Sequence, residues 1–283
     1  MPSIPDSRLP IPGSPVAFIG GGNMARSLVG ALVRGGADAR LIAVAEPNAN
    51  LREALSRDFG VAVHDDAGAA ARGADALVLA VKPQVMKAVC ADLVPVVAAA
   101  RPLAISIAAG IRIEQLRAWF GADLPIVRAM PNTPALIGAG ATGMIASAST
   151  SAAQRAQAES ILGAAGRTAW IEREDQMDTV TALSGSGPAY FFLLVEALED
   201  AAVAQGLPRE TARALATQTC LGAGRMLVED GEAPATLRER VTSPGGTTAA
   251  ALDAFAGGDL RGLVARAVAA ATRRGGELSE RYS

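Results

Sequence analysis

A late stretch of the chain, Arg240–Phe255, has the composition of an anion-binding turn. It reads RVTSPGGTTAAALDAF and places two glycines and two threonines between two stretches of helical pattern. Glycines let successive backbone N–H groups point at one anion, and the start of the following helix favours negative charge. We therefore expect Gly245, Gly246 and Thr247 to hold a carboxylate, with the Thr248 hydroxyl near a nitrogen atom of the same ligand.

The supply of acids and bases limits the reactions that this chain can catalyse. The only histidine is His64, and the only lysines are Lys82 and Lys87, so the second half of the chain has neither residue type. Interconversion of an alcohol and a carbonyl commonly needs such a group to move the hydroxyl proton. A protonated C=N bond can accept hydride without a strong acid, and it needs positioning, a carboxylate anchor and a nearby hydroxyl. The residues thus favour reduction of an imine.

A glycine-rich turn near the start of the chain predicts a dinucleotide site. It follows the apolar run VAFI and precedes a helical pattern, and it fits G-x-G-x-x-A. The first glycine permits the tight turn, the third lets backbone approach a pyrophosphate, and the alanine allows the helix to pack closely on the strand. The expected coenzyme contacts are Gly20, Gly21, Gly22, Asn23, Met24 and Ala25.

The ends of four further strands should lie on the same edge as the glycine turn. The second strand ends at Glu46, where an acidic residue binds the ribose hydroxyls of NAD and repels the 2′-phosphate of NADP. The sequence therefore suggests NADH at this position. The other expected coenzyme contacts follow later strands and are Ala80, Val81, Lys82, Pro83, Ala108, Ala109, Pro131 and Asn132.

The elements that position these residues divide the chain into two halves. Strand and helix patterns alternate from Val16 to about Ile145, which predicts parallel βαβ units in a doubly wound sheet. A helix over 151–163 and a possible last strand over 168–171 follow, and from about Asp175 the pattern is almost wholly helical. Pro188 should start, break or kink the first long helix there. The predicted domains are a tail over 1–14, a Rossmann domain over 15–172 and a helical domain over 173–283.

Composition narrows the class of protein. The chain has 283 residues, of which 50% are hydrophobic and 19% charged, with a net charge of −2. Such a composition can bury a sizeable core and gives no electrostatic reason to bind nucleic acid or an anionic membrane. Cys90 and Cys220 are far apart and predict free thiols in a reducing compartment, so we expect a cytoplasmic protein. The apolar helices of the second half predict a homodimer interface, and no metal site is predicted.

Six segments together carry a resemblance to a known family. FIGGGNMA, AVKP, SIAAG, RAMPNTPAL, LSGSGPAY and SPGGTT, in this order and spacing, resemble Δ1-pyrroline-5-carboxylate reductase from about Val16 to Ser283. The resemblance implies a Rossmann domain, a helical domain that dimerises by interlocking helices, and dimers often assembled into larger rings, up to a decamer. It also implies reduction of 1-pyrroline-5-carboxylate to L-proline, the last step of proline biosynthesis, with NAD(P)H and generally with NADPH.

The resemblance also assigns roles to residues of this sequence. Thr248 takes the place of the hydroxyl near the ring nitrogen, and Ser184, Gly185 and Glu174 lie where the family places other residues around the substrate. In that family the site is built across the dimer. One departure is Glu46, which stands where the family often has Ser or Thr and argues for NADH or for weak discrimination.

Three other functions remain open from the sequence. A β-hydroxyacid dehydrogenase shares both fold halves, although the lack of lysine after Lys87 speaks against it. A reductase for another cyclic imino acid is a closer alternative, and it is harder to exclude from the sequence. A nucleotide-binding regulator could keep the fold, but it would have no need of a carboxylate anchor at Gly245–Thr248.

Overall fold

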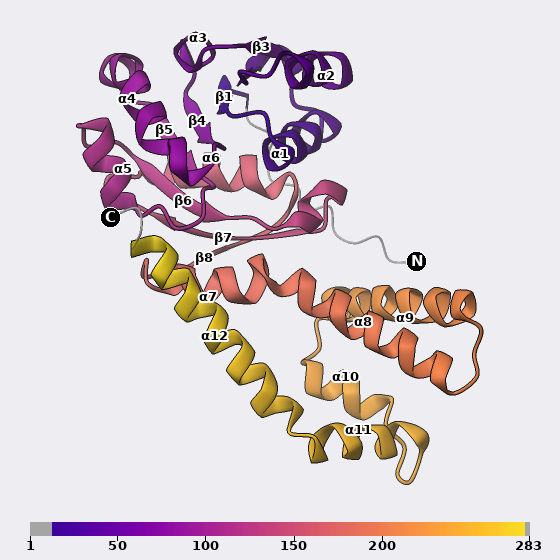
Figure 1. Cartoon of the computed structure of the whole chain (residues 1–283). Helices are drawn as coiled ribbons and strands as arrows, with labels where there is room; N and C mark the ends of the chain where they lie inside the picture. The colour runs from indigo at the N-terminus through magenta and orange to yellow at the C-terminus, as the bar shows by residue number, and fades with distance from the viewer. Residues whose placement is uncertain (1–12, 281–283) are drawn as a thin grey trace. The chain divides into compact units, whose positions relative to one another are not determined.

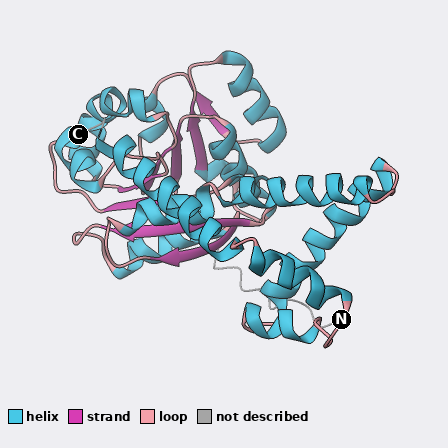
Figure 2. Cartoon of the chain, turned by 60° about the horizontal axis from the view of Figure 1, so that its bottom comes forward, coloured by secondary structure: helices cyan, strands magenta, loops and turns pink. Residues whose placement is uncertain are grey.

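The computed structural model describes residues 13–280, so nearly all of the tail predicted over 1–14 lies outside the described residues. Contacts divide the chain into two compact units. One unit holds all strands of the described residues and includes residues 13–186 together with the segment that begins at Ala271. The other unit, Gly187–Ala270, is wholly helical. Figure 2 distinguishes the helices from the strands by colour. The predicted domain boundary near residue 172 stays a prediction.

The first unit is built on a sheet with the strand order β3-β2-β1-β4-β5-β6-β7-β8. Neighbours from β3 to β6 pair in parallel, which gives the order 3-2-1-4-5-6 of a dinucleotide-binding Rossmann sheet. This confirms the predicted fold class. The strands are β1 (Val16–Ile19), β2 (Ile42–Ala45), β3 (Ala62–His64), β4 (Ala76–Leu79), β5 (Leu103–Ser106), β6 (Ile126–Met130), β7 (Gly140–Ala146) and β8 (Gly166–Trp170).

Helices cover both faces of this sheet (Figure 1). Side chains of α1, α2 and α6 form one apolar cluster with the sheet, and side chains of α3, α4 and α5 form the other. Along β1, Val16 and Phe18 belong to the first cluster while Ala17 and Ile19 belong to the second, as the two-residue period of a strand requires. The helices are α1 (Asn23–Arg34), α2 (Ala49–Phe59), α3 (Ala67–Ala71), α4 (Pro83–Ala100), α5 (Ile113–Phe120), α6 (Ala152–Gly163) and α7 (Gln176–Val180).

The last two strands depart from the parallel pattern. β7 was not predicted, and it runs antiparallel to β6, whereas β8 pairs with β7 in parallel. A parallel return would need a crossover of a dozen or more residues, usually a helix. Only a short 3-10 turn, η2 (Thr133–Ile137), separates β6 from β7. The chain therefore reverses direction and extends the sheet with an antiparallel hairpin.

The helix α4 is, among the described residues, the one helix long and apolar enough to cross a bilayer by composition. In this fold Met86, Cys90, Leu93 and Val97 of α4 are fully buried against the sheet. Burial also raises the pKa of the Cys90 thiol to about 12, which leaves it protonated and unreactive. Both cysteines are free, as predicted.

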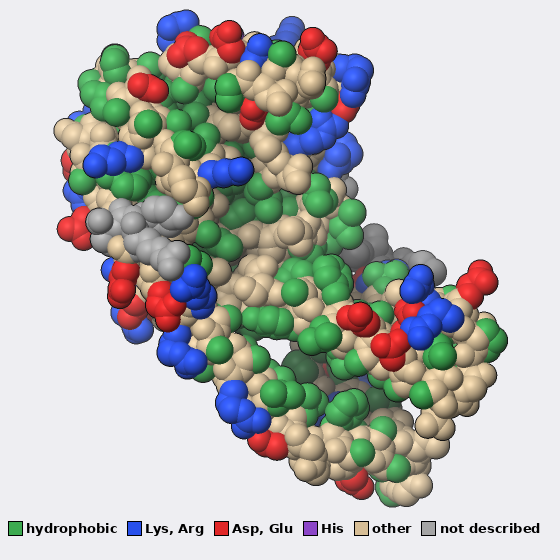
Figure 3. Space-filling view, viewed as in Figure 1, with side chains coloured by type: hydrophobic (Ala, Val, Ile, Leu, Met, Phe, Trp, Pro, Cys, Tyr) green, Lys and Arg blue, Asp and Glu red, His purple; other side chains and the backbone are tan. Residues whose placement is uncertain are grey.

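The helical unit contains α8 (Gly187–Ala204), α9 (Arg209–Glu229), α10 (Pro234–Arg240), α11 (Thr247–Gly257) and the first half of α12 (Leu260–Glu280). Pro188 lies in the first turn of α8, where its missing N–H is no loss, so the prediction that it starts a helix is confirmed. The unit exposes many large apolar side chains, among them Phe191, Phe192, Leu193 and Val241. Figure 3 shows hydrophobic side chains across this unit. Such an apolar surface is typical of an interface.

Candidate active site

The predicted coenzyme residues follow parallel strands whose carboxyl ends share one edge of the sheet. In the observed order, β1 is flanked by β2 on one side and by β4 on the other. The connection after β1 leads to β2 and the connection after β4 leads to β5, in opposite directions along the sheet. The gap between β1 and β4 is therefore the topological switch point, where such sheets bind ligands. Gly20 and Ala80 follow these two strands and face each other there, because Ala80 N–H donates to the Ile19 carbonyl.

The glycine turn between β1 and α1 has the geometry that a pyrophosphate needs. Gly20 has φ +104°, and a Cβ there would meet the Ala80 carbonyl oxygen at 2.8 Å, so only glycine fits. At Gly22, by contrast, a Cβ would meet nothing within 4 Å. Gly22 is also the N-cap of α1, and no side chain caps its first turn. The first N–H groups of α1 are therefore available to an anion, and the turn fits a dinucleotide.

Glu46 is held in the turn rather than extended to solvent. Its side chain is 9% exposed, and its two carboxylate oxygens accept hydrogen bonds from Gly21 N–H at 2.9 Å and Asn48 N–H at 3.0 Å. The carboxylate therefore joins the β1–α1 turn to the β2–α2 turn. This places it where the second strand of a Rossmann sheet meets the ribose, and it also gives Glu46 a role in fixing Gly21 that the sequence did not reveal.

The residues that follow β4 and β5 complete the edge of the sheet that carries the predicted coenzyme contacts, which we call the coenzyme edge. Lys82 is the N-cap of α4 with extended backbone and an exposed side chain, and Pro83 occupies the first helical position. Ala80 and Val81 are partly buried beside them. Ala108 is buried and Ala109 is exposed after β5. These positions agree with a coenzyme edge, and their contacts with a coenzyme stay predictions.

The end of β6 brings together two groups of predicted residues that are far apart in the sequence. Asn132 donates from Nδ2 to the Ser184 carbonyl at 2.9 Å and accepts from Ala141 N–H at 2.8 Å. A Cβ on Gly185 would lie 2.9 Å from the Met130 methyl carbon, so this glycine permits close packing on the strand end. One N–H and one oxygen lone pair of the Asn132 amide are thus taken by backbone groups, which fixes the orientation of this side chain.

Ser184 and Gly185 lie in a π-helical turn, η3 (Thr181–Gly185), that continues from α7. The Ser184 hydroxyl donates to the Val180 carbonyl at 2.9 Å. A π turn inside helical structure often marks a functional site. The structure therefore brings Ser184 and Gly185 to the coenzyme edge, beside Asn132.

Glu174 lies in a different cluster. Its Oε1 accepts from Arg128 Nη1 at 2.9 Å and from Ile113 N–H at 2.8 Å. The Arg128 side chain is 4% exposed, so this ion pair holds a nearly buried cation inside β6. Sequence reasoning missed Arg128, although a charged residue in the middle of the apolar strand IVRAM was a signal. The substrate role of Glu174 stays a prediction.

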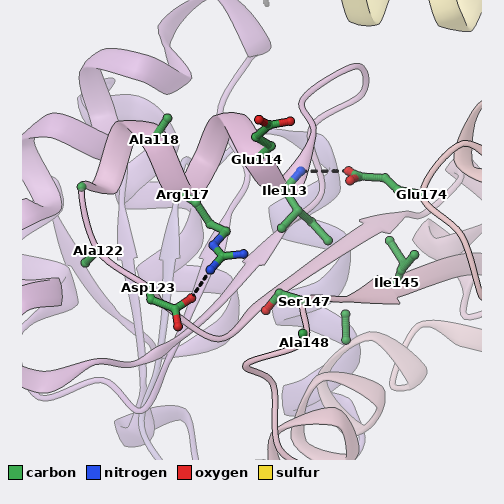
Figure 4. A pocket seen from close by; sticks show the side chains of 12 residues that line it. Ile113, Glu114, Arg117, Ala118, Ala122, Asp123, Ile145, Ser147, Ala148 and Glu174 are labelled. Carbon is green, nitrogen blue, oxygen red and sulfur yellow. Dashed lines mark hydrogen bonds and ion pairs between the residues drawn. The ribbon is translucent and has the colours of Figure 1, made fainter.

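A groove with a volume of about 770 Å³ opens beside Glu174. Figure 4 shows Glu114, Arg117 and Asp123 around it, with Arg117 paired to Asp123 at 2.5 Å. None of its lining residues belongs to the glycine turn or to the ends of β2 and β4. Of the predicted site residues, the lining of this groove includes Glu174 and none of the coenzyme contacts.

The four remaining predicted residues open α11 in the helical unit. Gly245 has φ +67°, and Gly246 is an N-cap without a side-chain capping bond. Thr247 is exposed and Thr248 is partly buried in the first turn. The opening of α11 therefore presents uncapped N–H groups next to a hydroxyl, as expected for a carboxylate anchor.

Comparison with known proteins matches both halves of the chain to family models. The model described as pyrroline-5-carboxylate reductase dimerisation matches residues 174–278. The model described as NADP oxidoreductase, coenzyme F420-dependent, matches residues 15–110.

Individual relatives match over nearly the whole chain. A pyrroline-5-carboxylate reductase of Pseudomonas aeruginosa is 49% identical over 94% of this chain and 97% of its own length. One from Arabidopsis thaliana is 40% identical, covering 96% and 99% of the two chains. The solved reductase of Coxiella burnetii has a TM-score of 0.92 and 44% identity, covering 94% and 98% of the two chains. The Plasmodium falciparum enzyme, solved with NADP bound, has a TM-score of 0.81 and 28% identity over 94% and 98%.

Proposed function

Because the chain belongs to the pyrroline-5-carboxylate reductase family, we propose that it reduces 1-pyrroline-5-carboxylate to L-proline with NAD(P)H. Hydride adds to the imine carbon, the two electrons of the C=N π bond pass to nitrogen, and nitrogen keeps its proton as the ring amine. The observation that carries the proposal is the joint match of both halves over nearly the full length of the relatives.

The sheet unit supplies the coenzyme half of this site. The uncapped start of α1 holds the pyrophosphate, Gly20 and Gly22 let it approach, and Glu46 lies toward the ribose. The reduced nicotinamide supplies the hydride when the coenzyme is bound. Loops after β4, β5 and β6 orient the nicotinamide ring at the switch point. This orientation favours hydride transfer because the reacting atoms are already in position.

The opening of α11 supplies the substrate half. Gly246 N–H already donates to the Ser243 carbonyl at 3.0 Å, so Gly246 helps by shaping the turn. The N–H of Thr247 holds the carboxylate, and the Thr248 hydroxyl lies at the imine nitrogen. The family resemblance also assigns Ser184 and Gly185 to the substrate. No strong acid is required, which fits a chain whose second half has neither His nor Lys.

The same proposal includes a homodimer in the cytoplasm. The match to a dimerisation model and the exposed apolar side chains of α8 and α9 support association of this unit with a second copy. Assembly of dimers into a ring, up to a decamer, is the further step that the family resemblance suggests. A protomer kept from associating would then lack part of its active site.

The test is the initial rate with DL-pyrroline-5-carboxylate, measured with NADPH and with NADH on one preparation. We expect turnover, with L-proline as product. Dinucleotide binding without turnover would contradict the proposal. Parallel reactions with a six-membered cyclic imino acid would then separate a reductase for another imine from a protein that only binds nucleotide.

A further inference from the structure

The second residue with a charge at the ribose end of the coenzyme edge is Arg52, in the first turn of α2. Its Nη1 donates to the Glu46 carbonyl at 2.7 Å and to the Pro47 carbonyl at 2.8 Å. The guanidinium is therefore anchored on the backbone that leaves β2. That backbone is where a Rossmann sheet distinguishes a ribose hydroxyl from a 2′-phosphate.

We propose that Arg52 binds the 2′-phosphate of NADPH and makes this chain accept that coenzyme despite Glu46. The inference deepens the proposed function by naming the residue that recognises one form of the coenzyme. Within the described residues, Nε and Nη2 of Arg52 have no hydrogen-bond partner. The edge formed by Nε–H and Nη2–H of an anchored guanidinium matches two oxygen atoms of a phosphate.

Two backbone donors at the start of α2 are already engaged. Asn48 Oδ1 accepts from the N–H groups of Asn50 and Leu51, so the start of α2 is capped by its own chain. This differs from α1, whose first turn is uncapped. A phosphate at the β2–α2 turn therefore has to take its hydrogen bonds from a side chain.

Two carboxylates, Glu46 and Asp66, follow the adjacent strands β2 and β3. Glu46 accepts from Gly21 N–H and Asn48 N–H, and Asp66 accepts from Gly68 N–H at 3.0 Å and Ala69 N–H at 2.7 Å. These backbone donors offset part of the negative charge without removing it. Glu46 and Arg52 thus act in opposite directions on a 2′-phosphate, and the preference of the chain is set by their difference.

The experiment compares two nucleotides that differ only in the 2′-phosphate, adenosine 2′,5′-bisphosphate and 5′-AMP, by calorimetry on the full chain. For the unchanged protein we expect tighter binding of the bisphosphate. Arg52→Gln should weaken the bisphosphate about tenfold, as expected for loss of a charge-assisted contact, and should leave 5′-AMP within about twofold. Arg57→Gln, on the same helix and paired with Asp58, is the matched control and should change neither affinity.

Two outcomes would overturn the proposal. One is equal binding of the two nucleotides by the unchanged protein. The other is an Arg52→Gln variant that weakens both nucleotides alike or neither. Calorimetry needs no turnover, so a failed reductase assay on the same preparation would count against the proposed function and not against Arg52.

Discussion

The ion pair between Arg128 and Glu174 allows the sharpest test of how the sheet unit is held together. Glu174→Gln removes one charge and keeps the shape of the side chain, because the Gln Oε1 can still accept from Arg128 and Ile113 N–H. Two unit charges about 4 Å apart interact by roughly 4 kcal/mol at an effective dielectric constant of 20. The hydrogen bond that remains, from the charged guanidinium to the neutral amide oxygen, retains about 1.5 kcal/mol.

The two side chains differ in exposure. This difference decides how much stability each single variant should lose and which variant should lose more. Arg128 is 4% exposed and Glu174 is 28% exposed. The cation left behind cannot be hydrated well, so we expect Glu174→Gln to lower the free energy of unfolding by about 2–3 kcal/mol. Arg128→Met should lower the free energy of unfolding by less, because water can reach the unpaired Glu174 carboxylate. The double variant should recover part of the loss.

Urea unfolding at a fixed protein concentration measures these free energies, with Glu172→Gln, an exposed glutamate of the same loop, as the control. A loss of less than about 0.5 kcal/mol for Glu174→Gln, the size of an ordinary surface change, would refute the reasoning. The KM for pyrroline-5-carboxylate should be measured on the same variants. A raised KM with unchanged stability would instead support the substrate role that the sequence suggested for Glu174.

Three further outcomes are expected. Thr248→Ala should lower kcat by about 10²-fold with dinucleotide affinity nearly unchanged, because only a contact at the imine nitrogen is lost, and calorimetry with NADPH would expose any wider damage. Glu46→Ser should shift preference toward NADPH by about 1–3 kcal/mol in the ratio of kcat/KM values, and an unchanged ratio would mean that Glu46 does not meet the ribose. Arg213 and then Arg209 hold the pKa of Glu199 below its ordinary value of 4.5, so this contribution to stability is present above about pH 4.5 and is lost as the pH falls. Glu199→Gln should therefore flatten the acid side of the stability curve in thermal melts, and an unchanged slope would contradict the pairing.

The coenzyme half could be predicted because its signals are local. A strand, a glycine turn and a helix follow one another within residues 16–34, and each agrees with the period and turn chemistry of its sequence. The parallel order then places the other strand ends on the same edge. The helix that starts at Pro188 was predicted for the same reason, since proline has a fixed backbone preference.

The parts that could not be predicted depend on contacts between distant residues. The bond from Gly21 to Glu46 spans 25 positions, and the bond from Asn132 to Ser184 spans 52. Neither has a sequence pattern, since an Asn or Glu side chain at a strand end serves a ligand or a backbone group equally well. Strand β7 was missed because GATGMIA begins with four small or polar residues and lacks clear alternation.

The path of the chain gives the helical unit the character of an insertion. The chain leaves the sheet unit after Ser186 and contributes to it again from Ala271, where the second half of α12 contacts α7 through Ser279 and Asp178. A shortened chain that stops at Ser186 would therefore lose part of the sheet unit along with the helices. Separate expression of the sheet unit would need two cuts and a new linker from Ser186 to Ala271.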